Sequence, residues 1–196
     1  MARVGMKHLV FATIGTESAS TAPTYGSPGL VLGRAVRGSR TPNRYDGKLY
    51  GDDGIAESYN GTRDMSIEVE TTELVEASAA TLGLFKTVGT GDNTVYRTTN
   101  KPTAFGGCGW VETHVRKGVT KYVAIWVYKT QLATGTEEAK TKGENLEYGT
   151  STLAGTALPA FADSDGDDIY TETKVFSTMA TAIAWLDGLA NIVSGS

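Results

Sequence analysis

Two histidines and one cysteine are the first side chains of this chain to consider for acid–base or nucleophilic chemistry. His8 and His114 each lie in a stretch that we expect to be a β-strand, whereas a Ser-His-Asp site needs its histidine beside a serine on a sharp turn. No G-x-S-x-G sequence is present. Cys108 lies in residues 106–109 (GGCG), and a nucleophilic cysteine favours a helix N-terminus or a basic neighbour instead. The glycines indicate a bulge or close backbone packing.

The acidic sequence of residues 163–168, DSDGDD, has the composition of a calcium-binding loop. Counted from Asp163, such a loop has glycine at its sixth position and glutamate at its twelfth, but this chain has Asp168 and Lys174 there. We therefore favour a solvent-exposed acidic turn over a calcium site. Residues 89–91 and 106–107 complete no phosphate-loop pattern, and no Cys/His cluster has zinc spacing. We expect no cofactor, no metal and no enzymatic activity.

The element around which the chain is organised is an expected β-hairpin over residues 105–132. Two β-rich runs, 110–116 and 119–128, flank Lys117-Gly118, and a glycine at the second loop position supplies the positive φ of a tight turn. This turn predicts Trp110 opposite Ile125. Residues 122–128 carry large apolar side chains on both faces, so both faces must be covered. We expect the chain's own second sheet to cover one face and a neighbouring subunit to cover the other.

Further strands are expected over residues 7–14, 30–39, 64–71, 94–99, 145–158 and 169–176, with a loop over 134–143. The strand 64–71 alternates apolar and polar residues, with Glu68 and Glu70 on its polar face. A helix is expected over 72–84, capped by a threonine and ended by Gly83, and a C-terminal helix over 177–190, capped by Ser177. The prediction is one mainly β domain, residues 1–196, with two packed antiparallel β-sheets, sandwich-like or barrel-like, a flanking α-helix, a C-terminal helix and a long extended loop.

The long extended loop is residues 40–59, which have no periodicity and contain turn residues throughout. Loops longer than about 12–15 residues are uncommon in compact domains. This one keeps more large apolar side chains than a disordered linker usually has. They are Tyr45, Leu49, Tyr50, Ile55 and Tyr59. We expect the loop to dock on another surface.

Composition restricts the function classes. The net charge of −4 over 196 residues gives no overall basic footprint for nucleic acid. Residues 1–50 hold seven Lys/Arg against two acids, and residues 137–172 hold nine acids against two Lys, so copies could attract one another head to tail. The single cysteine rules out an intrachain disulfide. The N-terminal apolar run is too short for a signal peptide, and we expect no membrane span.

An ordered set of sequence stretches resembles the major tail proteins, or tail-tube proteins, of bacteriophages with long non-contractile tails (siphovirus type). The stretches are residues 22–26 (APTYG), 41–43 (TPN), 49–58 (LYGDDGIAES), 118–132, 141–148 (TKGENLEY), 153–156 (LAGT) and 181–186 (TAIAWL). They are collinear over nearly the whole chain. No single stretch is a catalytic signature, so the specificity of the resemblance comes from their order.

The resemblance implies a structural virion protein, in the phage tail and, during assembly, in the host cytoplasm. In that family two packed β-sheets with a flanking helix form each subunit, and subunits form stacked, usually hexameric rings. The stack is the tube through which DNA leaves the capsid without specific binding. The implied partners are further copies of the chain, the tape-measure protein, and the tail terminator and tail-tip proteins. The immunoglobulin-like C-terminal domain of some relatives is not expected here.

Assembly residues are expected in the long loop, where aromatic side chains could anchor a contact. The candidates are Arg40, Arg44, Tyr45, Leu49, Tyr50, Asp52, Asp53 and Ile55. Arg34, Arg37, Arg40, Arg44 and Lys48 could also meet the acidic 137–172 region of another copy. Glu68 and Glu70 are candidates for lining a lumen in which DNA must slide, and an ordinary solvated strand face explains them equally well.

Two rival functions are considered for this sequence. A monomeric β-sandwich that binds carbohydrate or another surface would need an exposed Trp or Tyr in a groove, with Trp110 and Trp185 as candidates. An acid-rich hydrolase would need a pair of carboxylates, and no plausible constellation of this kind is found.

Overall fold

The structure of the chain, a computed structural model, describes residues 2–26, 28–52, 54–135 and 149–192. Its elements follow in chain order. The strands are β1 (Ala2–Thr16), β2 (Thr24–Tyr25), β3 (Leu30–Val31), β4 (Ala35–Arg44), β5 (Gly47–Gly51), β6 (Gly54–Tyr59), β7 (Thr62–Thr71), β8 (Phe85–Val88), β9 (Val95–Thr98), β10 (Phe105–Arg116), β11 (Val119–Thr134), β12 (Ser151–Ala157), β13 (Phe161–Ala162), β14 (Asp168–Ile169) and β15 (Thr171–Phe176). The helices are α1 (Glu76–Thr81), α2 (Met179–Leu189) and the 3₁₀ turn Gly91–Asn93.

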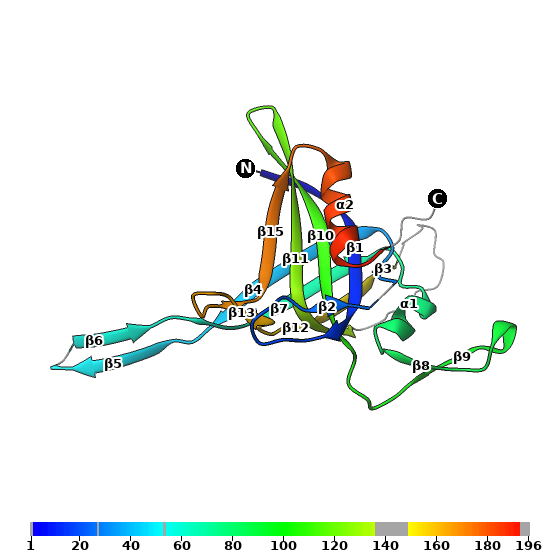
Figure 1. Cartoon of the computed structure of the whole chain (residues 1–196), viewed down its shortest axis with the longest axis horizontal. Coiled ribbons are helices and arrows are strands. Elements are labelled where there is room, and N and C mark those ends of the chain that lie inside the picture. Colours follow the sequence, from blue (N-terminus) through cyan, green and yellow to red (C-terminus); the bar gives the residue numbers. More distant parts are fainter. Residues whose placement is uncertain (1, 27, 53, 136–148, 193–196) are drawn as a thin grey trace, which may run out of the picture.

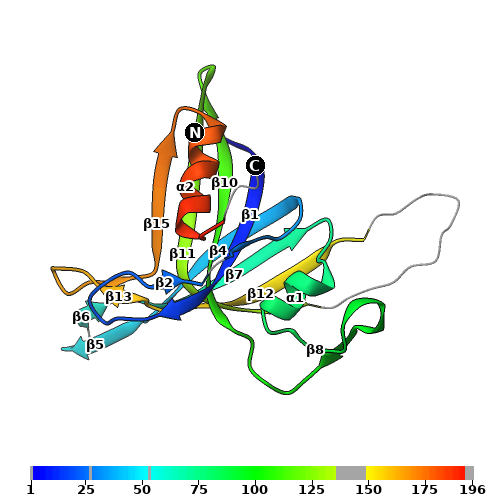
Figure 2. The same cartoon turned by 45° about the vertical axis from the view of Figure 1, so that its right-hand side comes forward.

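Most strands belong to one antiparallel sheet in the order β2-β1-β10-β11-β12-β7-β4, with β15 also paired to β11 and β3 to β1. The long strand β11 pairs with β15 over Tyr122–Val127 and with β12 over Thr130–Thr134. The sheet therefore folds over at β11. Strands β15, β11, β10 and β1 form one layer, and β12, β7 and β4 cross it (Figures 1 and 2). The expectation of a mainly β, sandwich-like fold with a C-terminal helix is confirmed.

The central hairpin has the predicted turn and register. Lys117 and Gly118 have φ of 48° and 77°, as a type I′ turn requires. Trp110 is paired with Ile125 in the ladder between β10 and β11. The two-residue turn therefore set the register of the longest strand pair.

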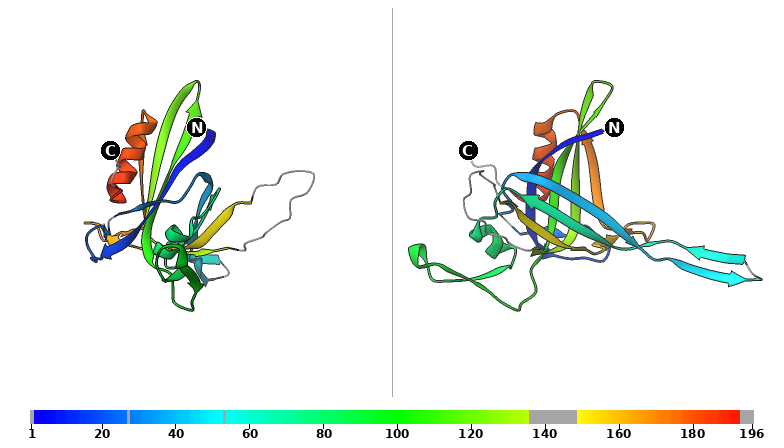
Figure 3. Two further views of the ribbon diagram at one scale, coloured as in Figure 1. Left: turned by 90° about the vertical axis from the view of Figure 1, so that its right-hand side faces the viewer. Right: turned by 180° about the vertical axis from the view of Figure 1, so that it is seen from behind.

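Both faces of β11 are covered by this chain itself. Val123, Ile125 and Val127 lie in a core between the two layers, together with Ile67 and Val69 of β7. The alternate residues of β11, Ala124, Trp126 and Tyr128, lie in a second core beneath α2, where Ala182 and Leu186 pack on them. Figure 3 shows α2 against this layer, away from β4, β7 and β12. The expectation that a neighbouring subunit covers the second face was therefore wrong, because the C-terminal helix does so.

Several predicted boundaries were wrong. The helix predicted over 72–84 with a threonine cap is the shorter α1, and its N-cap is Val75, which makes no side-chain hydrogen bond. It starts later than predicted because the amide of Thr72 donates to Arg34 O, which holds the preceding segment beside the start of β4. Gly83 ends it at φ 81°, as predicted. The second helix is capped by Thr178, whose Oγ1 accepts from the amide of Thr181.

Three predicted strands differ in extent. The predicted strand 30–39 is divided into β3 and β4 at Gly33, whose φ is 69°. Of the predicted strand 145–158, β12 is described, and the predicted loop 134–143 lies largely outside the described residues, which omit 136–148. The predicted strand 169–176 is divided between β14 and β15.

Residues 40–59 are not an irregular loop. Strand β4 continues to Arg44, and residues 47–59 form a second hairpin of β5 and β6. The amide of Tyr45 donates to Gly61 O, which joins this hairpin to the β4–β7 pair. The predicted loop is thus a regular β-ribbon that continues the sandwich outward (Figure 1).

Candidate assembly surface

The β5–β6 hairpin, residues 46–59, projects from the body at one end of its long axis and is called the arm below (Figures 1 and 3). Its large side chains are solvent-exposed. The exposed fractions are 61% for Leu49, 68% for Tyr50, 58% for Ile55 and 67% for Tyr59. Four large apolar or aromatic side chains exposed on one short hairpin are typical of an interaction site.

The arm has no core of its own. Tyr59 lies near Tyr45 at its base, with ring centroids 6.3 Å apart, but every described residue of β6 is exposed. A two-stranded hairpin alone is marginally stable in water. Docking on another surface would bury its apolar side chains and its unpaired strand edges.

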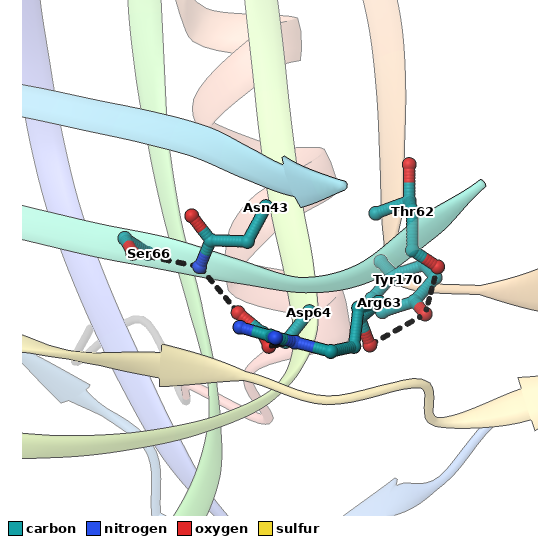
Figure 4. A network of polar contacts seen from close by, with 6 residues as sticks. All are labelled: Asn43, Thr62, Arg63, Asp64, Ser66 and Tyr170. Carbon is teal, nitrogen blue, oxygen red and sulfur yellow. Dashed lines mark hydrogen bonds and ion pairs between the residues drawn. The ribbon is translucent and has the colours of Figure 1, made fainter. Parts of the chain in front are cut away.

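The base of the arm is held by a network of polar contacts (Figure 4). Asn43 Nδ2 donates to Ser66 Oγ at 3.1 Å and also to Asp64, and Arg63 Nε donates to Asp64 Oδ2 at 2.7 Å. The hydrogen bond from Asn43 and, after it, that from Arg63 hold the pKa of Asp64 below its usual range. From the other layer, the Tyr170 hydroxyl reaches the carbonyls of Thr62 and Arg63 at 3.2 and 3.1 Å. The network therefore fixes the direction in which the arm leaves the body.

The predicted assembly residues do not all lie together. Tyr45, Leu49, Tyr50, Asp52 and Ile55 lie on the arm or at its base, and Asp52 occupies the turn with φ 47°. Asp53 lies outside the described residues.

The two arginines of the prediction have different surroundings. Arg44 is exposed at the end of β4. Arg40 is paired with the buried Ile67 and therefore faces inward between the layers, where its Nη1 lies within 3.4 Å of Thr171 and Thr173. Burial lowers the pKa of its guanidinium from the ordinary value.

Several cations expected to meet the acidic region of another copy have partners within this chain. Arg37 Nη1 lies 3.1 Å from Glu68 Oε1, and Lys48 Nζ lies 3.7 Å from Asp46 Oδ2. Part of the acidic region, residues 137–148, lies outside the described residues. The intrachain pairs reduce the positive charge that these residues could offer to another copy.

The candidate lumen residues Glu68 and Glu70 lie on the outer face of the β4-β7-β12 layer, opposite the core side chains of Ile67 and Val69. Their cross-strand neighbours are small or polar, and Glu70 accepts from the Thr150 hydroxyl. The residues that share this face are Arg37, Ser39, Thr41, Asn43, Asp64, Ser66, Thr152, Ala154 and Thr156. It is a hydroxyl-rich surface with more acidic than basic side chains.

The histidines, the cysteine and the acidic turn have structural roles. His8 Nε2 lies 2.7 Å from Asp187 of α2, and His114 Nε2 lies 2.8 Å from Glu112. Cys108 is buried, and burial raises the pKa of its thiol to about 12. Asp163 Oδ1 accepts from two amides of its own turn. Among the residues that the structure describes, no cluster of His, Cys, Asp and Glu could hold a metal ion.

The tryptophans proposed for carbohydrate binding are engaged in the fold. Trp110 is fully buried and donates from Nε1 to Glu112, so it cannot be an exposed stacking platform. Trp185 lies 6.0 Å from Phe176 between ring centroids, with Lys174 Nζ over both rings.

Sequence reasoning missed a further exposed hairpin, formed by β8 and β9. Only residues 94–99 were predicted as a strand. The signal for its partner was the β-rich run Phe85–Val88 followed by Gly89, which has φ 91°. It also missed Glu112, which is 7% exposed, accepts from Trp110 and His114 and forms an ion pair with Arg3.

A scan against protein-family models and a search of curated proteins found no match for this chain. Within the described residues, none of the helices has both the length and the apolar character that crossing a membrane requires.

Proposed function

We propose that this chain is a structural virion protein that self-assembles into stacked, hexameric rings forming the tail tube of a long-tailed bacteriophage, the conduit for DNA ejection. The observation that carries the proposal is the arm, a β-ribbon that exposes Leu49, Tyr50, Ile55 and Tyr59 far from the core. A monomer that kept these side chains in water would gain nothing from them. Copies that bury them gain about 25 cal/mol per Å² of apolar surface removed from water.

The outer face of β4, β7 and β12 supports the same proposal, as the surface that lines the lumen. Most of its side chains carry hydroxyls or carboxylates, and its one arginine, Arg37, is paired with Glu68 at 3.1 Å. Such a face releases few counterions from DNA and holds it weakly. DNA can then slide along it without specific binding.

The proposed partners follow from this role. They are other copies of the chain, the tape-measure protein that occupies the lumen during assembly, and the terminator and tip proteins at the two ends of the tube. The chain would act in the virion and, before assembly, in the host cytoplasm, with no enzymatic turnover and no cofactor. A carbohydrate-binding monomer is less well supported, because Trp110 is buried.

Negative-stain electron microscopy of the purified chain tests the proposal. We expect rings or tubes from the native sequence. In an arm-truncated variant, residues 46–60 are replaced by Asn-Gly, a two-residue type I′ turn that suits the β4–β7 hairpin. We expect this variant to keep its β circular dichroism and to form no tubes. Intact tubes from the variant would exclude the arm as the assembly element.

A further inference from the structure

Two exposed hairpins leave the body in opposite directions. The arm lies at one end of the longest axis, and the β8–β9 hairpin with the segment that follows it, residues 85–101, lies at the other (Figures 1 and 3). We call residues 85–101 the basic hairpin. Among the residues that the structure describes, each hairpin is a two-stranded sheet with no third strand, and a sheet this small is marginally stable without a partner.

The arm carries an excess of negative charge. It has one cationic residue, Lys48, and four acidic residues, Asp46, Asp52, Asp53 and Glu57. Lys48 Nζ is paired with Asp46 Oδ2 at 3.7 Å. The remaining acids include Asp52 and Glu57, which are both exposed. The tip of the arm is therefore an anionic surface.

The other hairpin carries an excess of positive charge. It has three cationic residues, Lys86, Arg97 and Lys101, and one acidic residue, Asp92. Lys86 and Arg97 are direct cross-strand partners and are both exposed, an arrangement that like charges disfavour. Over residues 2–26, 28–52, 54–135 and 149–192, no ion pair involves either of them. An anionic partner would relieve their repulsion.

The apolar side chains of the two hairpins also match. Val95 and Tyr96 of β9 are 50% and 37% exposed. Leu49, Tyr50 and Ile55 of the arm could be buried against such a surface, with acids meeting cations around them.

We propose that the acidic arm of one copy docks on the basic hairpin of a second copy. This inference rests on the proposed self-assembly and names the surface that receives the arm. The two surfaces differ and lie at opposite ends of the folded molecule, so the contact is heterologous. Each added copy therefore presents a new unoccupied arm. Such a contact propagates into rings or filaments.

Paired charge reversals test the docking. One variant carries Asp52→Lys with Glu57→Lys, the other Lys86→Glu with Arg97→Glu, and a third combines all four changes. We expect each pair alone to raise the concentration needed for half-maximal assembly by about tenfold or more at low salt. The variant with all four substitutions should assemble at a concentration close to that of the native chain. Asp165→Lys with Asp167→Lys, on an exposed turn that belongs to neither hairpin, is the control for net charge and should have little effect.

Cross-linking provides a test that does not depend on charge. Cys108 is buried with its pKa raised to about 12, so an introduced cysteine is the reactive thiol. We expect a bismaleimide to join Ile55→Cys chains to Val95→Cys chains in a mixture, and neither variant strongly to itself. Ser164→Cys, on the exposed turn, should not be joined to Ile55→Cys.

The outcomes separate this inference from the proposed function. The docking would be overturned, with self-assembly intact, if the native chain and both charge-reversed variants assembled equally well. It would also be overturned if a mixture of the Ile55→Cys and Val95→Cys chains gave no cross-links. The docking would also be overturned if the variant with all four substitutions did not recover assembly although its circular dichroism and thermal midpoint were native. A native chain that never associates would contradict the proposed function and this inference together.

Discussion

Arg40 and Thr173 contact each other between the two β-layers, with 3.3 Å from Nη1 to Oγ1. Arg40 belongs to β4 and is paired with the buried Ile67, so its side chain faces the interior. The charge of Glu112 acts on its guanidinium and partly offsets the cost of burial. This arginine therefore links the layers and is not freely available to another subunit.

Replacing this inward arginine should affect stability more than assembly. In Arg40→Glu a carboxylate replaces the donor and comes under the charge of Glu112, so we expect a loss of about 1–3 kcal/mol in the free energy of unfolding. Arg44→Glu at the exposed end of β4 should change it by about 0.5 kcal/mol or less. Urea denaturation in dilute solution measures both. Equal effects of the two substitutions would contradict the inward role of Arg40.

Stability should depend on the ionisation of Glu112. Burial raises the pKa of this carboxyl, but donors from His114 and Trp110 and the charge of Arg3 outweigh burial and hold it below its ordinary value of 4.5. As pH falls, the unfolded chain takes up this proton first, so the stabilisation is present above the ordinary pKa and is lost as pH falls through the lowered value.

The Glu112→Gln variant should therefore show a flatter decline of unfolding free energy with falling pH than the native chain. It should also be less stable at pH 7, because an amide replaces a carboxylate that accepts from two side chains and pairs with Arg3. Urea denaturation at a series of pH values from 7 to about 3 covers the window in which carboxyls titrate. Glu57→Gln on the exposed arm is the control. Parallel pH profiles for the native chain and Glu112→Gln would show that the native pKa is not lowered.

Gly109 allows the β10–β11 pair to pack beneath α2. A methyl group there would lie 2.6 Å from Trp126 and 2.9 Å from both Ile125 O and Leu186. We expect Gly109→Ala to lower the free energy of unfolding by about 1–3 kcal/mol, as overpacking of a core does. Gly5→Ala, with no atom within 4 Å of its new methyl group, should be nearly neutral. A Gly109→Ala variant as stable as Gly5→Ala would show that the packing can relax.

The base of the arm should control its order. Asn43→Ala removes the donor to Asp64 and Ser66, and we expect about 1 kcal/mol of lost stability because the site is partly solvated. Amides of β5 and β6 should then exchange hydrogen faster, while those of β10 keep their protection. Thr41→Ala, on the same face of β4, is the control. Unchanged exchange in the arm of Asn43→Ala would mean that the network does not hold it.

The elements that the sequence predicted best are those whose pattern is imposed by a core within the chain. Met65, Ile67 and Val69 alternate because one face of β7 is buried, and Lys117-Gly118 requires its turn whatever the surroundings. The arm was predicted as an irregular loop because both of its faces are exposed, so no core imposes a period of two on its side chains. Its apolar content, rather than its periodicity, was the correct signal.

The cover of β11 was not predictable in the same way. Residues 122–128 required burial on both faces, but the sequence does not state whether a helix of the same chain or a second copy provides it. The apolar stripe of α2, which includes Ala182 and Leu186, was recognised without being assigned to that face. The inward orientation of Arg40 was likewise hidden, because the bulge between Ala35 and Arg37 shifts the alternation of β4.

Sedimentation velocity of the native chain and the arm-truncated variant, over a range of concentrations, tests most directly whether the arm drives self-assembly. The native chain should shift from a 20.7 kDa monomer to fast-sedimenting assemblies as concentration rises, while the variant should remain monomeric with an unchanged fold. A native chain that sediments as a monomer at every concentration, or a variant that assembles as readily as the native chain, would contradict the account.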